Sequence, residues 1–520
     1  MPEITKTDVD RPAAVPAYIW VMFGSVAVIV YFFGLNIPLV GPDEPRYAQV
    51  AREMLESGDW ITPTLAGHHW FEKPALLYWL QIGSYKLFGV SEFAARLGPA
   101  LFGLGTVASL WLLGRSVERS AISTANNEQR TSNQFANLLA LVAATTLGIL
   151  VFSRGASFDI MITFPITAAL VSFFIYDRSQ KQYLPLVLFY VFIGIALLAK
   201  GLIGIVFPFA IVVMFYLLSR RMPGRTFFIS TVWGALLALA IASIWYWPMY
   251  QRYGSQFIDE FFIQHHFQRF TSNKYKHPQP FYFFIWVLPL MTLPWMPFFF
   301  AALWRTIKGL IRQENTDPTR GADNKKRSVK LSPSPLFIFA ICWMVVPLVF
   351  FSLSGSKLPG YILPAVPGAI IITAVYLFEK VSKSNRWRNV VLAIAGTTLI
   401  GSILLLAFVV PGFAERDSVK SLINASDERG YSSSRILTLH NISHNAEFYA
   451  AGRLVRDADG KQRYLSAIRE ITDQVMAHGG GPLLVLVPVN HLAQLTSAND
   501  LRVEVIKENG ELAIAAVSAK

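Results

Sequence analysis

Residues 43–96 read DEPRYAQVAREMLESGDWITPTLAGHHWFEKPALLYWLQIGSYKLFGVSEFAAR, a block far more polar than the apolar stretches on either side. It begins with an acidic pair, Asp43 and Glu44, followed by Arg46, and it contains a Glu-Lys-Pro run at 72–74. Ionisable residues are costly at a membrane boundary, so their presence there indicates function. The block therefore marks both an interruption between two apolar spans and the first place to look for a site.

The composition is that of a polytopic membrane protein. The 520 residues are 53% hydrophobic and only 15% charged, whereas soluble domains carry about 25% charged residues. The formal net charge is +13, but lysine and arginine collect in loops that stay on the cytoplasmic side of a membrane, which argues against nucleic-acid binding. The single cysteine, Cys342, excludes an intrachain disulfide and a cysteine-based zinc site.

Apolar runs predict about eleven to thirteen membrane-spanning helices, because a span needs roughly 20 apolar residues. The first run follows a polar N-terminus without a small-residue cleavage site, which favours an uncleaved span over a signal peptide. The expected segments lie near 17–35, 94–114, 135–152, 158–176, 183–199, 201–218, 227–248, 281–304, 335–353, 360–379 and 389–411.

The loop charges predict the orientation. With a cytoplasmic N-terminus, alternation of the spans places the basic loops 115–134, 177–182, 219–226, 305–334 and 380–388 inside. An odd number of spans then places the C-terminus on the periplasmic side. We therefore expect the polar block and the residues after 412 to share the outer face.

The tail changes character and predicts a separate domain. Strand-like runs at 435–440, 481–488, 501–506 and 511–517 alternate with helical patterns at 461–478 and 490–497. This alternation is typical of a small α/β domain of two or three layers. The predicted architecture is thus an α-helical membrane domain, 1–411, with interfacial helices at 43–90 and 255–270, and a periplasmic α/β domain, 412–520. The tail shows no nucleotide-binding motif and no catalytic set, and we expect a scaffold or lid.

The start of the polar block predicts a helix of about 15 residues, too polar to span a membrane. Asp43 follows a Gly-Pro break, in the position of an N-cap, and Gly58 ends the periodic pattern. When Asp43 is considered without the other polar residues, helix capping is enough to explain it. Glu44 is rotated by about 100° from Asp43, so the two carboxylates do not face one point.

Three further positions carry charge near the outer boundary. Lys73, beside Glu72, is suited to a lipid phosphate, whereas an aromatic-belt anchor explains the neighbouring tryptophans well but Glu72 poorly. Asp159 lies near the outer end of a span and needs a partner or a water-filled cavity. Arg154 is a candidate partner, and ion pairing and catalysis remain equal alternatives for Asp159.

Two later outer segments complete the constellation. The amphipathic run at 255–270 ends in His265, His266 and Arg269, and the turn at 352–367 contains Lys357 and Tyr361. Adjacent histidines on a helix point to different faces, so they do not form a metal pair by themselves. Cations gathered from Lys73, Arg269 and Lys357 at one boundary indicate a phosphate ligand.

Taken together, these blocks resemble the GT-C membrane glycosyltransferases of the aminoarabinose transferase and protein mannosyltransferase type. The resemblance covers nearly all of 17–411 and rests on the polar block, on QHHFQRF (264–270) and on KLPGYILPAVP (357–367). It implies inverting transfer of a sugar from an undecaprenyl phosphate-linked donor to lipid A or a related glycolipid. The reaction would occur at the periplasmic face of the bacterial inner membrane, without a nucleotide.

The resemblance also implies roles for individual residues. Asp43 matches the acidic residue central to catalysis, accompanied by Arg46, and Asp159 matches a second acidic residue. Glu72 and His266 match a zinc site, although the doubled histidine leaves His265 as an alternative ligand. Lys73, Arg269 and Tyr361 match positions that hold the carrier phosphate, to which the charge pattern adds Lys357.

Two other functions compete with this one. A transferase acting on protein or another cell-envelope acceptor would use the same donor and the same charged residues. A transporter or flippase would place its ionisable residues near the bilayer midplane, with paired broken helices. The charges here gather at one face and no half-to-half symmetry is visible, so we expect an enzyme, acting as a monomer.

Overall fold

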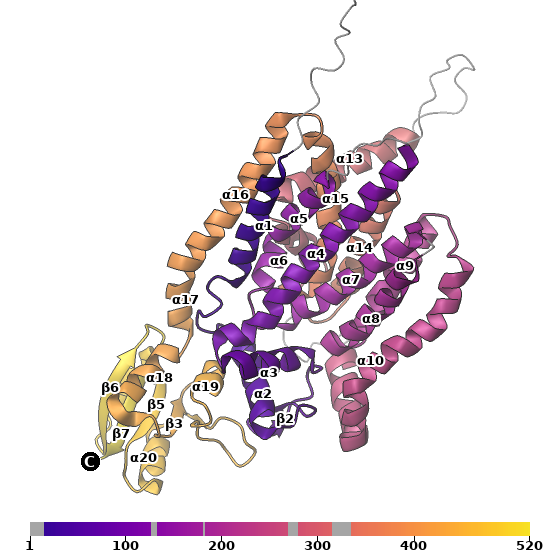
Figure 1. Ribbon diagram of the computed structural model, residues 1–520. Coiled ribbons are helices and arrows are strands. Elements are labelled where there is room, and N and C mark those ends of the chain that lie inside the picture. The colour runs from indigo at the N-terminus through magenta and orange to yellow at the C-terminus, as the bar shows by residue number, and fades with distance from the viewer. Residues whose placement is uncertain (1–14, 126–132, 180–181, 269–278, 315–333) are drawn as a thin grey trace, which may run out of the picture.

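The computed structural model describes residues 15–125, 133–179, 182–268, 279–314 and 334–520, and of residues 121–125, 266–267 and 309–314 the backbone alone (Figure 1). A long helical bundle is followed by a small domain that contains a sheet. We call the end of the bundle where this C-terminal domain lies the domain end, and the opposite end the far end (Figure 1).

The helices of the bundle follow the apolar runs of the sequence. Its first half contains α1 (Ala17–Phe32), α2 (Asp43–Ser57), α3 (Leu76–Phe88), α4 (Glu92–Ala125), α5 (Gln134–Ala144), α6 (Leu147–Phe152), α7 (Phe158–Ser179), α8 (Tyr183–Lys200) and α9 (Ile203–Leu218). Its second half contains α10 (Arg225–Phe257), the π-helix η1 (Ile258–Gln268), α12 (Phe283–Met291), α13 (Met296–Glu314), α14 (Pro335–Ser352), the 3₁₀-helix η2 (Pro359–Ala365), α15 (Val366–Val381) and α16 (Asn385–Phe408).

Each of the eleven predicted spans falls on one or two of these helices. Among the described residues, seven helices are long and apolar enough to cross a membrane, and α12 with α13 forms an eighth span bent by 118°. Three shorter apolar helices, α1, α5 and α9, account for the rest. The structure thus confirms a polytopic helical membrane protein.

Helix α7, whose first turn carries Asp159, lies inside the bundle. Its most apolar stretch is 83% buried, compared with 17% for α16 at the periphery. It packs against α4, α8 and α9. Because lipid is as apolar as these side chains, close packing and polar contacts hold such helices together. A central helix of this kind fixes the residues at its ends precisely.

Helix α2 begins and ends as the sequence predicts, at Asp43 and before Gly58, whose φ is 72°. The N-cap prediction was wrong by one residue. Pro42 occupies the N-cap, and Asp43 is the first helical residue, with no cap hydrogen bond from a side chain. A two-stranded hairpin, β1 (Thr64–Leu65) with β2 (His68–His69), follows before α3. Glu53 of α2 holds this hairpin by accepting hydrogen bonds from the backbone amides of Ala66 (2.8 Å) and Gly67 (3.1 Å).

The C-terminal domain is a five-stranded mixed sheet in the order β4-β3-β5-β7-β6. Its strands are β3 (Ile436–Leu439), β4 (Tyr464–Leu465), β5 (Leu483–Pro488), β6 (Leu501–Glu508) and β7 (Leu512–Ala519). Its helices are α17 (Val410–Asp417), α18 (Lys420–Ser426), the π-helix η3 (Asp427–Tyr431), α19 (His444–Tyr449), α20 (Ile468–Ala477), the 3₁₀-helix η4 (Val489–His491) and α21 (Leu492–Thr496).

Alternate residues of the strands build two separate cores, so the domain has three layers. One face packs on α20 and α21 and the other on α18 and α19. The four predicted strands are present, whereas β4 lies where the sequence favoured the start of a helix. The boundary expected at 412 falls inside α17, so the chain enters the domain through a helix.

Candidate functional site

The first turn of α2 carries an ion pair at the domain end. The Asp43 carboxylate accepts a hydrogen bond from Arg46, one turn further along the helix. A carboxylate in the first turn is also stabilised by the positive end of the helix dipole. The Asp43 side chain remains 49% exposed, compared with 19% for Arg46. Asp43 is therefore held by its neighbour yet open to a substrate.

The second predicted pair lies next to the first. Glu72 and Lys73 form an ion pair at 3.0 Å, and both side chains are largely buried. The Arg46 guanidinium lies over the Trp70 ring, 5.3 Å from its centre. Burial alone would lower the pKa of Arg46, but surrounding groups, Asp43 and Glu72 among them, raise it. Segments 43–46 and 70–73 thus form one charged cluster.

A second cluster surrounds Asp159. Lys200, the last residue of α8, donates to the Asp159 carboxylate at 2.5 Å. The same ammonium lies 5.0 Å from the centre of the Tyr361 ring in η2. Gly360 permits this approach, since a Cβ at that position would overlap the Asp159 carboxylate. The structure therefore brings Asp159, Tyr361 and Lys200 together.

The suggested partner of Asp159 was wrong. Arg154 donates instead to the backbone carbonyls of Val30, Tyr31 and Phe33, which lie at the end of α1. These orphaned carbonyls attract the guanidinium because the helix ends there. Lys200 is not among the residues predicted from the sequence, although a lysine at the outer end of a span was a usable signal.

Aromatic packing joins the two clusters. Phe158, next to Asp159, meets the ring of Tyr47 edge-on at 4.9 Å and that of Tyr78 at 5.6 Å. Tyr47 and Tyr78 are both buried. Burial, with the charge of Glu72 next in importance, raises the pKa of each hydroxyl well above its ordinary value, which keeps both neutral. The two clusters are thus fixed against each other by a rigid aromatic contact.

The remaining predicted residues are Lys357, Arg269 and His266. Lys357 is buried and donates to the backbone carbonyls of Ser354 (2.5 Å) and Gln279 (3.1 Å), which fixes the turn before η2. Its contact with a carrier phosphate stays a prediction. Arg269 and the side chain of His266 lie outside the described residues. The predicted interfacial helix 255–270 corresponds to the end of α10 and η1, with a kink at Gly254. Its phenylalanines pack against Phe71 and other aromatic residues.

The predicted zinc site pairs Glu72 with His266, whose side chain lies outside the described residues. Glu72 offers a carboxylate, a hard oxygen ligand that zinc accepts, but it already binds Lys73 at 3.0 Å. Among the described residues, no group of three or more histidine, cysteine, aspartate or glutamate side chains lies close enough to hold a metal. The pairing of Glu72 with His266 therefore stays a prediction.

The C-terminal domain reaches the first cluster, which sequence reasoning missed. Arg52 of α2 donates to the Phe448 carbonyl (2.6 Å), and Tyr449 accepts from the amide of Leu39 (2.8 Å). At the start of α19, burial lowers the pKa of His444 and the nearby Arg46 lowers it further. A mostly neutral imidazole thus lies within the electrostatic reach of Arg46.

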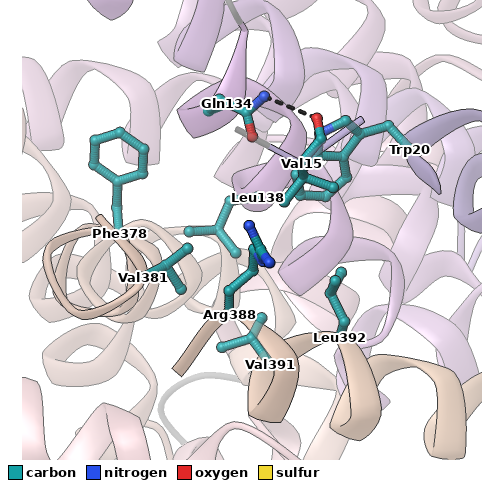
Figure 2. A pocket seen from close by; sticks show the side chains of 9 residues that line it. All are labelled: Val15, Trp20, Gln134, Leu138, Phe378, Val381, Arg388, Val391 and Leu392. Atoms are coloured by element: carbon teal, nitrogen blue, oxygen red, sulfur yellow. Dashed lines mark hydrogen bonds between the residues drawn. The ribbon is translucent and has the colours of Figure 1, made fainter. Parts of the chain in front are cut away.

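A crevice at the far end is a different feature. Side chains from α1, α5, α15 and α16 line it, among them Trp20, Phe378 and Arg388 (Figure 2). Gln134 donates to the Val15 carbonyl beside it at 3.2 Å. The lining is mostly apolar and includes none of the predicted site residues. The two charged clusters at the domain end, and not this crevice, form the candidate site.

Known proteins have sequences similar to this chain. A family model described as dolichyl-phosphate-mannose-protein mannosyltransferase matches residues 38–253. An undecaprenyl phosphate-alpha-4-amino-4-deoxy-L-arabinose arabinosyl transferase from Serratia proteamaculans is 31% identical over 399 residues, which are 74% of this chain and 63% of that protein. The transferase of the same name from Aeromonas salmonicida is 32% identical over 369 residues, 68% of this chain and 60% of that protein. Both matches thus cover less than two thirds of these curated relatives.

A solved structure has the same fold over almost the whole chain. The crystal structure of ArnT from Cupriavidus metallidurans bound to undecaprenyl phosphate aligns with a TM-score of 0.74 and 22% identity, covering 96% of this chain and 98% of that chain. The chain thus has the fold of this solved transferase, a helical membrane bundle followed by a small C-terminal domain. In sequence, the chain is similar to aminoarabinose transferases and, over residues 38–253, to the protein mannosyltransferase model.

Proposed function

We propose that this protein transfers a sugar, aminoarabinose in the first instance, from an undecaprenyl phosphate-linked donor to lipid A or a related glycolipid. The observation that carries the proposal is the pair of adjoining charged clusters, around Asp43 and around Asp159, at one end of a GT-C bundle. The names of the curated relatives supply the sugar and the carrier. The solved relative was crystallised with undecaprenyl phosphate.

The proposed location is the bacterial inner membrane, with a cytoplasmic N-terminus and a periplasmic C-terminal domain. Basic loops at the far end support this orientation, because lysine and arginine are retained on the cytoplasmic side. The charged clusters would then face the periplasm, where lipid A lies. The protein is proposed to act as a monomer.

The reaction breaks the bond between the sugar C1 and the carrier phosphate oxygen and forms a bond to an acceptor oxygen on the opposite face. The departing phosphate gains negative charge, which Lys73 and Arg269 would stabilise, with Tyr361 as a hydrogen-bond donor. In the structure, Lys73 belongs to the first cluster, with a largely buried side chain, and Tyr361 lies at the second. A leaving group held between them would place C1 near both carboxylates.

Asp43 has the exposure that an acceptor-side residue needs. If the acceptor is a hydroxyl, Asp43 takes its proton as general base. If the acceptor is a lipid A phosphate, no proton has to leave, and Asp43 would stabilise the positive charge that develops on the sugar ring. Asp159, held by Lys200, would orient the sugar. A zinc ion bound by Glu72 and His266 would add positive charge near the carrier phosphate.

The alternative acceptor is protein or another component of the cell envelope. The match of residues 38–253 to a protein mannosyltransferase model favours this alternative. The donor side of the site would be the same, because both reactions use a polyprenyl phosphate sugar. The acceptor is therefore the part of the proposal that most needs an experiment.

Purified protein would be incubated with undecaprenyl phosphate-linked aminoarabinose and either lipid A or an envelope protein fraction, with products identified by mass spectrometry. We expect modified lipid A with the wild type and a loss of at least about 1,000-fold with Asp43→Ala, the range seen when a central catalytic group is removed. Glu504→Gln is the matched control, since Glu504 is also a half-exposed carboxylate paired with an arginine, at 2.8 Å, but on strand β6. Modified protein without modified lipid A would establish the alternative. Full activity of Asp43→Ala would exclude the catalytic role.

A further inference from the structure

Glu44, the residue after Asp43, has a largely buried carboxylate that accepts several hydrogen bonds. The Glu44 carboxylate accepts from Arg96 Nε (3.0 Å) and Nη2 (2.6 Å), from the Val40 amide (3.0 Å) and from the Ala156 amide (2.7 Å). Only about 10% of the Glu44 side chain is exposed, compared with 49% for Asp43. Burial alone would raise the pKa of Glu44, but the charge and hydrogen bonds of Arg96 lower it, so the carboxylate stays ionised.

Arg96, in the first turns of α4, has a hydrogen-bond acceptor for every N–H group of its guanidinium. Besides Glu44, its guanidinium donates to the backbone carbonyls of Leu35 (3.0 Å), Ile37 and Pro38 (3.1 Å). A guanidinium has five N–H donors in a fixed fork, and all five have an acceptor here. The segment between α1 and α2 is therefore clamped to α4 by one side chain.

The two partners connect the two charged clusters. Glu44 is covalently next to Asp43, and through the Ala156 amide it holds the loop that leads into α7, three residues before Asp159. Such a bidentate pair tolerates little change in distance or angle. Both partners are largely buried, with about 5% of the Arg96 side chain and about 10% of the Glu44 side chain exposed.

We propose that Glu44 and Arg96 form a positioning pair that sets the distance between Asp43 and Asp159, and with it the geometry of sugar transfer. The inference rests on the proposed function for the identity of the reaction, while the pair itself is a feature of the fold. A displacement of about 1 Å between reacting groups can lower a rate about 100-fold. Glu44 and Arg96 are thus expected to control turnover without binding the donor.

The test compares Glu44→Gln with a carboxylate of the same kind at the far end. Asp177 is buried and accepts from Tyr216 Oη (2.9 Å) and Arg221 Nη2 (2.9 Å), so Asp177→Asn removes a similar charge remote from the site. We expect Glu44→Gln to lower kcat about 100-fold with the donor KM changed less than about threefold, the pattern of a lost transition-state arrangement. Asp177→Asn should lose thermal stability to a similar degree and keep its kcat.

A second measurement does not depend on turnover. Hydrogen exchange of the Val40 and Ala156 amides should be faster in Glu44→Gln than in the wild type, and unchanged in Asp177→Asn. If Glu44→Gln fails to fold, Arg96→Lys replaces it, because lysine keeps the charge but loses the fork. Arg96→Lys should show the same drop in kcat.

The outcomes separate the two proposals. Normal kcat in folded Glu44→Gln, or an equal loss of kcat in Asp177→Asn, overturns the positioning role while wild-type transfer upholds the proposed function. Absence of transfer by the wild type overturns the proposed function, and unchanged exchange at Val40 and Ala156 in Glu44→Gln then overturns the positioning pair as well.

Discussion

The two ends of the helical bundle both contain ion pairs, but they use them differently. At the far end, Asp177 pairs with Arg221, and Arg305 pairs with Glu379. In the loops at that end, basic residues outnumber acidic residues. At the domain end, acidic and basic side chains alternate within two adjoining clusters. An excess of one sign sets the orientation of a membrane protein. Balanced, partly open pairs such as Asp43 with Arg46 leave charges available to a reacting ligand.

The first test of this difference substitutes a glycine at each end, and among the comparisons of the two ends it should give the largest effect. In Gly360→Ala the new methyl group would overlap the Asp159 carboxylate, so η2 or Asp159 has to move. We expect kcat to fall at least about 100-fold, because the second cluster loses its geometry. Turnover of folded, detergent-purified protein measures this effect.

Gly114→Ala is the matched control at the far end. Its new Cβ would lie 2.6 Å from the Cα of Ala136, where α4 meets α5. Overpacking of this kind costs about 1–3 kcal/mol of stability, but kcat per folded molecule should stay normal. An equal loss of kcat in Gly114→Ala would show that the two ends are not functionally distinct.

At both ends, the sequence predicts the helices and strands better than the contacts between side chains that lie far apart in the chain. The spans and the strands of the tail depend on local apolar patterns, and α2 between Asp43 and Gly58 depends on local turn signals, so these predictions were confirmed. The pairing of Asp159 with Lys200 joins residues 41 apart in the chain. No local pattern distinguishes Lys200 from Arg154, and only the packing of α7 on α8 decides between them.

The C-terminal domain was harder still to place from the sequence. The short helix α19 carries the contacts with α2, yet its six residues show no clear periodicity. Arg52 meets Phe448 across 396 positions of the chain. A contact over such a separation is fixed by the docking of two finished domains. The expected scaffold or lid therefore turns out to be in direct contact with the helix that carries Asp43.

An intermediate effect is expected from this docking contact. The Tyr449 hydroxyl accepts from the Leu39 amide (2.8 Å) and donates to Glu92 (3.0 Å). Tyr449→Phe leaves the amide without its partner, at a cost of about 1–3 kcal/mol, and loosens the segment that leads into α2. We expect a fall in kcat of about three- to tenfold, measured together with thermal unfolding.

Tyr216→Phe provides the comparison at the far end. This substitution removes the hydrogen bond of 2.9 Å from Tyr216 to Asp177. It should lower the stability of the protein without lowering kcat. A loss of turnover as large as that of Tyr449→Phe would mean that any buried hydroxyl contributes to activity through stability alone. The domain contact would then have no special relation to the site.

The smallest expected effect concerns pH, and it should arise at the domain end alone, because no histidine occurs in the far-end loops. Burial and Arg46 lower the pKa of His444 below its usual 6.5. The folded state therefore favours the neutral imidazole, and the unfolded chain binds more protons as the pH falls through about 6.5. Stability is present above that pH and is lost below it. Between pH 7.5 and 5.5 the wild type should lose about 1–2 °C more in Tm than His444→Gln. His478→Gln is the control substitution at an exposed histidine. A slope in His444→Gln equal to that of the wild type would show that burial and Arg46 do not lower the pKa of His444.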